Sequence, residues 1–158
     1  MSTQKNLEEL SELRLHGMQR AYRSIAESNS EHTNDEMMAH LIEAEREDRK
    51  DRRMQRLLQN AKFRYHALPE ELDLKTDRNI DKDQIINLLE GTFIDKGEHV
   101  VITGATGGGK SFIASAIGHK ACRLGNRVLY QSCRKLFSML SMASAEGNYQ
   151  KKLKHIAK

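Results

Sequence analysis

A short glycine-rich segment constrains this chain more than any other part of its sequence. Residues 104–111 read Gly-Ala-Thr-Gly-Gly-Gly-Lys-Ser and fit the pattern G-x-x-x-x-G-K-[ST], the phosphate-binding loop also called Walker A. Glycines let successive backbone N–H groups turn toward one anion without a Cβ clash. In such a loop Lys110 reaches the β and γ phosphates of ATP, and Ser111 offers its hydroxyl to Mg²⁺. We therefore predict a nucleotide site made of Gly104, Ala105, Thr106, Gly107, Gly108, Gly109, Lys110 and Ser111.

The residues on either side of this loop predict an α/β fold. The run Val100–Thr103 has the composition of a short buried strand, and Ser111–Leu124 has an apolar side typical of a helix that ends at Gly125. A second strand is predicted at Val128–Gln131 and a second helix at Arg134–Ala145. Alternating strands and helices indicate a parallel sheet. We expect residues 98–158 to form the first part of a P-loop NTPase domain.

The first half of the chain is predicted to be helical. Residues 3–28 have apolar side chains at a spacing of three to four, and Gly17 is expected to split this stretch into two helices. Thr33 and Glu36 form the pattern of a capping box, which begins a long helix over about residues 34–66. Pro69 ends it, and an acidic connector with a short helix at about residues 83–90 follows. The predicted organisation is a helical domain over residues 1–68, a connector over 69–97 and the α/β domain over 98–158.

The acid that an ATPase needs on a later strand is not found in this sequence. After Lys110 the only acidic residue is Glu146, and no apolar strand precedes it, so it is a poor candidate for holding Mg²⁺. Residues 1–100 contain 16 lysines and arginines against 21 acids, whereas residues 101–158 contain ten against one. The chain is therefore expected to stop short inside its ATPase domain, before the Walker B strand. We expect nucleotide binding, and we leave open whether the chain hydrolyses ATP.

Composition excludes several classes of protein. No stretch of about 18 apolar residues exists, so we expect no membrane span. The polar N-terminus has no apolar signal-peptide core. The two cysteines, Cys122 and Cys133, are too few for a disulfide scaffold, and together these features predict a cytoplasmic protein. The seven histidines show no metal-ligand spacing, so the expected metal ion is the Mg²⁺ at Ser111.

Basic residues concentrate on the second half of the long helix, and two interpretations of them stay open. They either contact the phosphates of double-stranded DNA, or they belong to a solvated helix with i,i+4 ion pairs such as Glu45–Arg49 and Asp48–Arg52. The candidate DNA-binding residues are Arg46, Arg49, Lys50, Arg52, Arg53 and Arg56.

Three segments resemble one family. Residues 13–18 are similar to an early LRLxGM segment, residues 41–49 to a long-helix LLxxExxxR segment, and residues 114–123, with the phosphate loop, to a signature region. Together they resemble the IstB-type ATP-binding proteins of insertion sequences, relatives of the DnaC helicase loader within the AAA+ class. The resemblance covers nearly the whole chain, and it favours the DNA interpretation of the long helix.

This resemblance implies a helper of DNA transposition. Such a protein binds ATP with Mg²⁺, forms a homo-oligomer on double-stranded DNA and delivers target DNA to the transposase of the same element. Only Gly104, Gly109, Lys110 and Ser111 carry over from the family as phosphate-loop residues. Two alternatives stay open: a DnaC-like helicase loader whose N-terminal helices grip another protein, and an inactive remnant.

Overall fold

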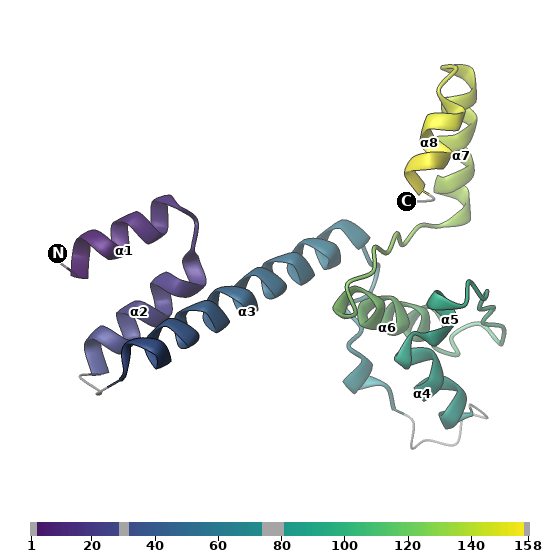
Figure 1. Cartoon of the computed structure of the whole chain (residues 1–158). Helices are drawn as coiled ribbons and strands as arrows, with labels where there is room; N and C mark the ends of the chain where they lie inside the picture. Colours follow the sequence, from purple (N-terminus) through teal and green to yellow (C-terminus); the bar gives the residue numbers. More distant parts are fainter. Residues whose placement is uncertain (1–2, 29–31, 74–80, 157–158) are drawn as a thin grey trace. The chain divides into compact units, whose positions relative to one another are not determined.

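The computed structural model describes residues 3–28, 32–73 and 81–156, and the chain divides into two units at residues 55 and 56. Residues 1–55 contain α1 (Thr3–Glu12), α2 (His16–Ser28) and most of α3 (Asn34–Ala61) (Figure 1). Residues 56–158 contain the end of α3 and the remaining elements. These are η1 (Pro69–Glu71), α4 (Lys82–Glu90), α5 (Thr92–Asp95), α6 (Lys110–Arg123), α7 (Cys133–Ala145) and α8 (Tyr149–Ile156). The predicted boundaries after residues 68 and 97 stay predictions.

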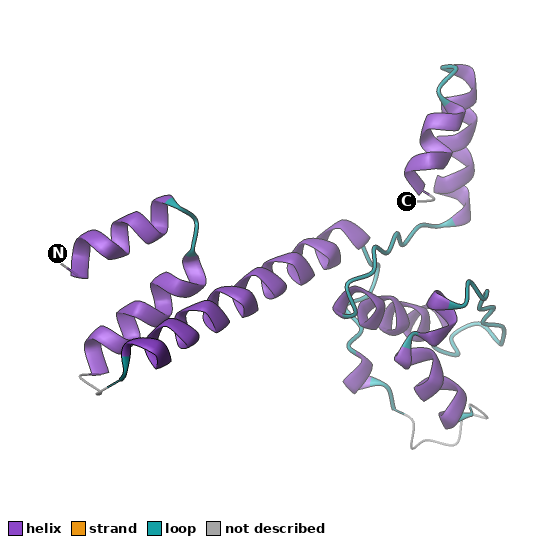
Figure 2. Ribbon diagram, viewed as in Figure 1, coloured by secondary structure: helices purple, strands orange, loops and turns teal. Residues whose placement is uncertain are grey.

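The predicted α/β fold is wrong for the described residues, because every regular element among them is helical (Figure 2). The predicted strands at Val100–Thr103 and Val128–Gln131 are irregular segments. A strand satisfies its backbone only by pairing with a neighbouring strand, and no described segment forms such a ladder with either of them. The N–H of Tyr130 instead donates to the carbonyl of Ala61 at 2.9 Å, and the side chain of Val101 is 83% exposed. Apolar β-branched composition alone therefore gave a false strand signal.

The first helical stretch is split as predicted, although Gly17 does not break it. The chain turns at residues 13–15, where Arg14 has a φ of 59° and the N–H of Leu15 donates to the carbonyl of Leu10 at 2.9 Å. Gly17 is the second residue of α2 and is buried against α3. A Cβ at Gly17 would lie 2.3 Å from the carbonyl oxygen of Ala44. The glycine therefore permits a close approach of two helices.

The capping box that was predicted for the long helix is confirmed. The carboxylate of Glu36 accepts from the N–H of Thr33 at 2.9 Å, and the Thr33 hydroxyl accepts from the N–H of Glu36 at 3.3 Å. The helix ends at Ala61, five residues before the predicted end, and Lys62 follows with a φ of 55°.

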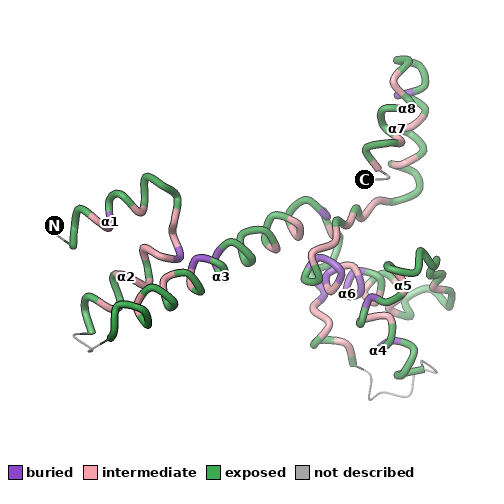
Figure 3. The backbone as a smooth tube through the Cα atoms, in the orientation of Figure 1, coloured by how far each residue is buried: buried purple, intermediate pink, exposed green. Residues whose placement is uncertain are grey.

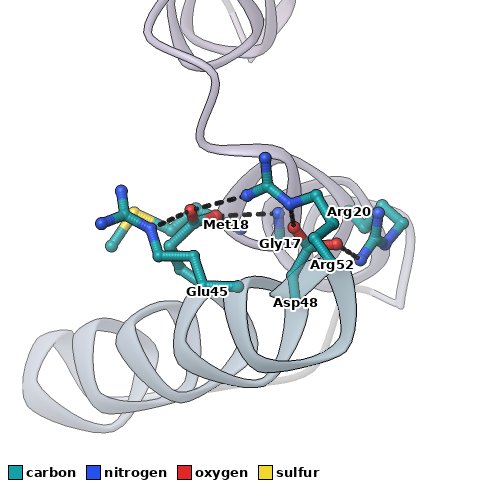
Figure 4. A network of polar contacts seen from close by, with 7 residues as sticks. Gly17, Met18, Arg20, Glu45, Asp48 and Arg52 are labelled. Carbon is teal, nitrogen blue, oxygen red and sulfur yellow. Dashed lines mark hydrogen bonds and ion pairs between the residues drawn. The ribbon is translucent and has the colours of Figure 1, made fainter. Parts of the chain in front are cut away.

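Two buried carboxylates of α3 hold α2 in place (Figure 4). Oε2 of Glu45 accepts from the backbone N–H of Gly17 at 2.9 Å and of Met18 at 3.4 Å, so it satisfies donors at the start of α2. A carboxylate at this end also interacts favourably with the helix dipole. One turn further along α3, Asp48 is 8% exposed and accepts a hydrogen bond from Arg20 of α2.

Two arginines of α3 neutralise these carboxylates. Arg49 donates from Nε to Oε1 of Glu45 at 2.8 Å. The Nε of Arg52 lies 2.5 Å from Oδ2 of Asp48, and its Nη2 lies 3.3 Å from Oε1 of Glu45. The predicted i,i+4 pairs Glu45–Arg49 and Asp48–Arg52 are therefore confirmed. Removing one member would leave a buried charge without compensation, which costs more than the loss of an exposed ion pair.

The second unit has a core of small residues around α6. Ala116 and Cys122 of α6 are fully buried, and Ala61 and Ala67 are as well. Figure 3 shows this concentration of buried backbone at α6, whereas α7 and α8 are mostly exposed. The C-terminus of α6 is closed by Gly125 as predicted, since its N–H donates to the carbonyl of Cys122 at 2.9 Å.

α7 and α8 form a helical hairpin at the C-terminal end of the described chain. The helix α7 was predicted, beginning one residue later than it does. None of the helices in the described ranges combines the length and the apolar character that a membrane span requires.

The buried carboxylates predict an acid-sensitive contact between α2 and α3. The hydrogen bond from Arg20 lowers the pKa of Asp48. Burial raises the pKa of Glu45, but the hydrogen bonds from Arg49, Met18 and Gly17 outweigh this and lower the pKa below its ordinary value. Both groups therefore stabilise the folded state fully above their unfolded pKa values of about 4, and this stability is lost as the pH falls through the folded values.

We expect the urea midpoint of the chain, followed by helical circular dichroism, to fall between pH 6 and pH 3. In Glu45→Gln the midpoint at pH 6 is expected to be lower by the equivalent of about 1–3 kcal/mol, because an amide cannot replace the ionised partner of Arg49. The fall of the urea midpoint between pH 6 and pH 3 should be smaller in Glu45→Gln than in the unchanged chain. The matched control is Glu47→Gln, an exposed acid two positions away. Equal pH dependence in both variants would contradict the account.

Candidate functional site

The glycine-rich loop leads directly into α6. Gly109 is the residue before the helix, with a φ of 78°, and Gly107 has a φ of 81°. Residues with a side chain rarely adopt this left-handed backbone conformation, so both positions favour glycine. The loop turns through a hydrogen bond from the N–H of Gly108 to the carbonyl of Ala105 at 3.2 Å, and α6 begins as the carbonyl of Gly109 accepts from Phe112 and Ile113. Residues 104–108 are exposed to solvent.

Several backbone donors of this loop are unused. Within the described part of the chain, the N–H groups of Gly107, Gly109, Lys110 and Ser111 have no acceptor. The last two belong to the first turn of a helix, where four N–H groups lack a partner inside the helix and the dipole favours an anion. The loop therefore fits a phosphate group, which offers several charged oxygen acceptors to such donors.

Lys110 folds back on the loop. Its ammonium group donates to the carbonyl of Ala105 at 2.6 Å and to that of Gly104 at 3.0 Å. These carbonyls are neutral acceptors, whereas a phosphate oxygen carries a negative charge that attracts the ammonium group in addition to accepting its hydrogen bond. A phosphate in the loop would thus compete well for the lysine. All eight predicted loop residues, Gly104 to Ser111, are consecutive and lie together at the N-terminal end of α6.

The far half of α6 is fixed by an aromatic contact. Gly118 approaches Phe63 so closely that an added Cβ would lie 2.7 Å from the ring atom Cε1. The next residue, His119, is 5% exposed and stacks on Phe63 with ring centroids 5.8 Å apart. Burial, then the charge of Arg123, lower the pKa of His119, so the ring is neutral at pH 7. This packing holds the helix that carries the phosphate loop.

The predicted Mg²⁺ position has one candidate ligand, the exposed hydroxyl-bearing Ser111 at the second position of α6. No group of three or more histidine, cysteine, aspartate or glutamate side chains in the described residues is arranged to hold a metal ion. Glu146 is the residue that follows α7, and its carboxylate accepts from the side-chain amide of Asn148 at 2.9 Å.

The structure divides the candidate DNA-binding residues into distinct groups. Arg49 and Arg52 are engaged by Glu45 and Asp48, as described above. Lys50, Arg53 and Arg56 are exposed and make no ion pair within the described ranges. Arg46 makes an exposed pair with Glu43 at 3.3 Å, a type of interaction that contributes little to stability.

Arg46, Lys50 and Arg53 occupy one side of α3, since residues three, four and seven apart share a face of a helix. This set, which we call the outer basic face, lies entirely in residues 1–55. Arg56 lies in the second unit.

Sequence reasoning named Glu45 and Asp48 as members of ion pairs but missed that both are buried. A signal was present, because both continue the spacing of Leu41 along α3 at positions i+4 and i+7. Charged residues at positions of an apolar stripe indicate buried, paired charges.

Comparison with known proteins agrees with the pattern of motifs. Residues 8–158 match the family model described as IstB-like ATP binding protein. A relative in Sinorhizobium fredii is 36% identical over 161 residues, which cover 99% of this chain and 66% of that protein. A relative in Pseudomonas fluorescens is also 36% identical over 161 residues, covering 100% of this chain and 70% of that protein. Both are named as putative ATP-binding proteins of insertion sequences.

A third relative is less similar to this chain. It is named as a putative ATP-binding protein of an insertion sequence in Geobacillus stearothermophilus. It is 30% identical over 148 residues, which cover 92% of this chain and 59% of that protein. The chain thus spans about two thirds of the length of the first relatives that it matches. The family model covers nearly all of the chain, and on this ground the chain belongs to the IstB-like ATP-binding protein family.

Proposed function

We propose that this chain is an ATP-binding helper of insertion-sequence transposition. The loop Gly104–Ser111 holds the phosphates of ATP together with Mg²⁺, and the outer basic face of α3 contacts the backbone of double-stranded DNA. The observation that carries the proposal is the phosphate-loop sequence at the start of α6, with backbone N–H groups, those of Gly107, Gly109, Lys110 and Ser111 among them, that have no acceptor in the described residues.

Nucleotide binding by this loop would be electrostatic. The N–H groups of Gly107, Gly109, Lys110 and Ser111 would donate to phosphate oxygens, and the Lys110 ammonium would leave the carbonyls of residues 104 and 105 for the β and γ phosphates. The Ser111 hydroxyl would bind Mg²⁺, which supplies charge neutralisation between the phosphates.

DNA binding is assigned to the outer basic face because Arg49 and Arg52 are paired with buried carboxylates, and Arg56 belongs to the second unit. Arg49 and Arg52 neutralise buried carboxylates, and moving them to DNA would leave Glu45 and Asp48 uncompensated. Arg46, Lys50 and Arg53 can reach a phosphate without this cost, and each such interaction releases condensed counterions from the duplex. The names of the relatives place them in insertion sequences, and from this we propose the transposase of the same element and further copies of the chain as partners.

We expect the purified chain to bind a fluorescent ATP analogue saturably in the presence of Mg²⁺. Lys110→Ala should weaken this binding by about tenfold or more, because the variant cannot form the charge-assisted hydrogen bond to phosphate. Fluorescence anisotropy titration of both proteins measures the effect.

Lys120→Ala is the matched control for this titration, since Lys120 lies on the same helix away from the loop. Its affinity for the analogue should equal that of the unchanged chain. Binding that survives in Lys110→Ala, or that falls equally in both variants, would show that the loop does not hold the phosphates.

We expect the variant Arg46→Ala/Lys50→Ala/Arg53→Ala to bind duplex DNA of any sequence more weakly than the unchanged chain does. The slope of log affinity against log salt should become shallower by roughly 0.9 for each phosphate that the variant no longer neutralises. Electrophoretic mobility shift or anisotropy at several salt concentrations gives both quantities.

The control for the DNA assay is Arg23→Ala on α2, an exposed arginine of the same unit that is not part of the outer basic face. Hydrogen exchange of the α2 amides should be unchanged in the triple variant, because the pairs of Arg49 and Arg52 are intact. If the triple variant keeps the affinity and salt slope of the unchanged chain, the outer basic face does not bind DNA.

A further inference from the structure

A groove runs along the hairpin of α7 and α8. It has a volume of about 450 Å³, and most of its lining comes from one side of α7. We call it the α7–α8 groove, defined by Arg134, Lys135, Ser138, Met139, Met142, Ala143, Glu146 and Lys152. Neither the phosphate loop nor the outer basic face of α3 contributes to it.

The floor of the groove is apolar and adaptable. Met139, Met142 and Ala143 make up the apolar part of the lining, which we call the floor; Ala143 is 2% exposed whereas Met142 is 62% exposed. Methionine is unbranched and polarisable, so it adjusts to apolar side chains of different shape and is common on surfaces that bind peptides. The exposed Met142 thus offers contact area to an apolar side chain from outside the hairpin.

The charged part of the lining, which we call the edges of the groove, is mostly basic. Arg134, Lys135 and Lys152 line it, with Glu146 as the only acid. Over the whole hairpin, residues 133–156, five lysines and arginines face one glutamate. A ligand that fits this surface must therefore be negatively charged along its flanks.

The apolar floor distinguishes an acidic protein segment from nucleic acid. Phosphate backbones are bound through their charge by lysine and arginine, and a methionine floor adds nothing to that interaction. An amphipathic helix uses both features, because its apolar stripe enters the groove while its flanking charges meet the edges. Charge complementarity and the apolar floor together select this ligand.

The length of the groove also suits a helix. Lys135, Ser138, Met142 and Glu146 follow one another at spacings of three and four, so the groove follows a single face of α7. The thirteen residues of α7 span roughly 20 Å at the rise of an α-helix. This length accommodates a partner helix of about three to four turns.

We propose that the α7–α8 groove is a docking site for an acidic amphipathic helix of a partner protein. The groove shares no residue with the nucleotide and DNA surfaces, so the ATP and DNA experiments above neither support nor weaken the proposal.

NMR spectra of the methionine methyl groups test the docking site directly. The full chain is labelled with ¹³C at its methionine methyl groups and titrated with a synthetic 18-residue peptide that has leucines at positions i, i+3, i+4 and i+7 and glutamates on the flanks. We expect the signals of Met139 and Met142 to shift, while those of Met18 and Met54 stay in place. The control peptide has the same composition with its leucines distributed around the helix, and it should produce no saturable shift.

Matched variants separate the groove from the rest of the hairpin. Met142→Ser should weaken peptide binding by about tenfold, whereas Phe137→Ser should not, although Phe137 is 68% exposed on the same helix and does not line the groove. Lys152→Glu should weaken binding more than Lys154→Glu, which reverses the same charge outside the groove. Circular dichroism confirms that each variant keeps its helices.

Three results would overturn the proposal. The first is equal binding of the two peptides. The second is a shift of the Met142 signal by duplex DNA at the same charge concentration and not by the amphipathic peptide. The third is self-association of the chain in sedimentation that Met142→Ser abolishes, since the groove would then hold a second copy.

Discussion

The carboxylate of Glu45 accepts hydrogen bonds from the first N–H groups of α2, and the arrangement of residues 1–55 depends on this contact. It requires Gly17, because any side chain there would collide with the backbone of α3. It also requires cations, because a carboxylate that is 5% exposed is costly to bury without partners. Arg49 and Arg52 meet this need and are thereby separated from the arginines that remain in solvent.

In both units a glycine inside a helix allows a neighbouring group to pack closely against that helix. Large aliphatic side chains are few in the core, and in each unit a glycine inside a helix permits a close approach: Gly17 against α3 and Gly118 against the ring of Phe63. The second contact steadies α6, whose N-terminus carries the phosphate loop. The loop itself remains exposed, with unused N–H donors and a lysine held only by neutral carbonyls. A packed helix with exposed, unused donors at its N-terminus is an arrangement suited to binding phosphate.

Local signals in the sequence predicted most of the helices and several of their ends, although the long helix ends five residues earlier than predicted. The Thr33–Glu36 capping box, the closure of α6 at Gly125 and the positions of α4 and α7 follow from short-range chemistry that a window of a few residues contains. The strands were predicted wrongly, because pairing depends on a neighbour that a local apolar run does not reveal. The burial of Glu45 and Asp48 was missed, since the partners Gly17 and Arg20 lie 28 residues away in sequence.

Hydrogen exchange of the full chain with and without ATP and Mg²⁺ tests the central claim most directly, which is that the loop before α6 holds the phosphates of a nucleotide. The account predicts that amides of residues 107–111 exchange more slowly when ATP is added, because their N–H groups acquire phosphate acceptors. Amides of α2 and of the α7–α8 hairpin should exchange as before. Protection by ATP elsewhere in the chain, with residues 107–111 unchanged, would contradict the account.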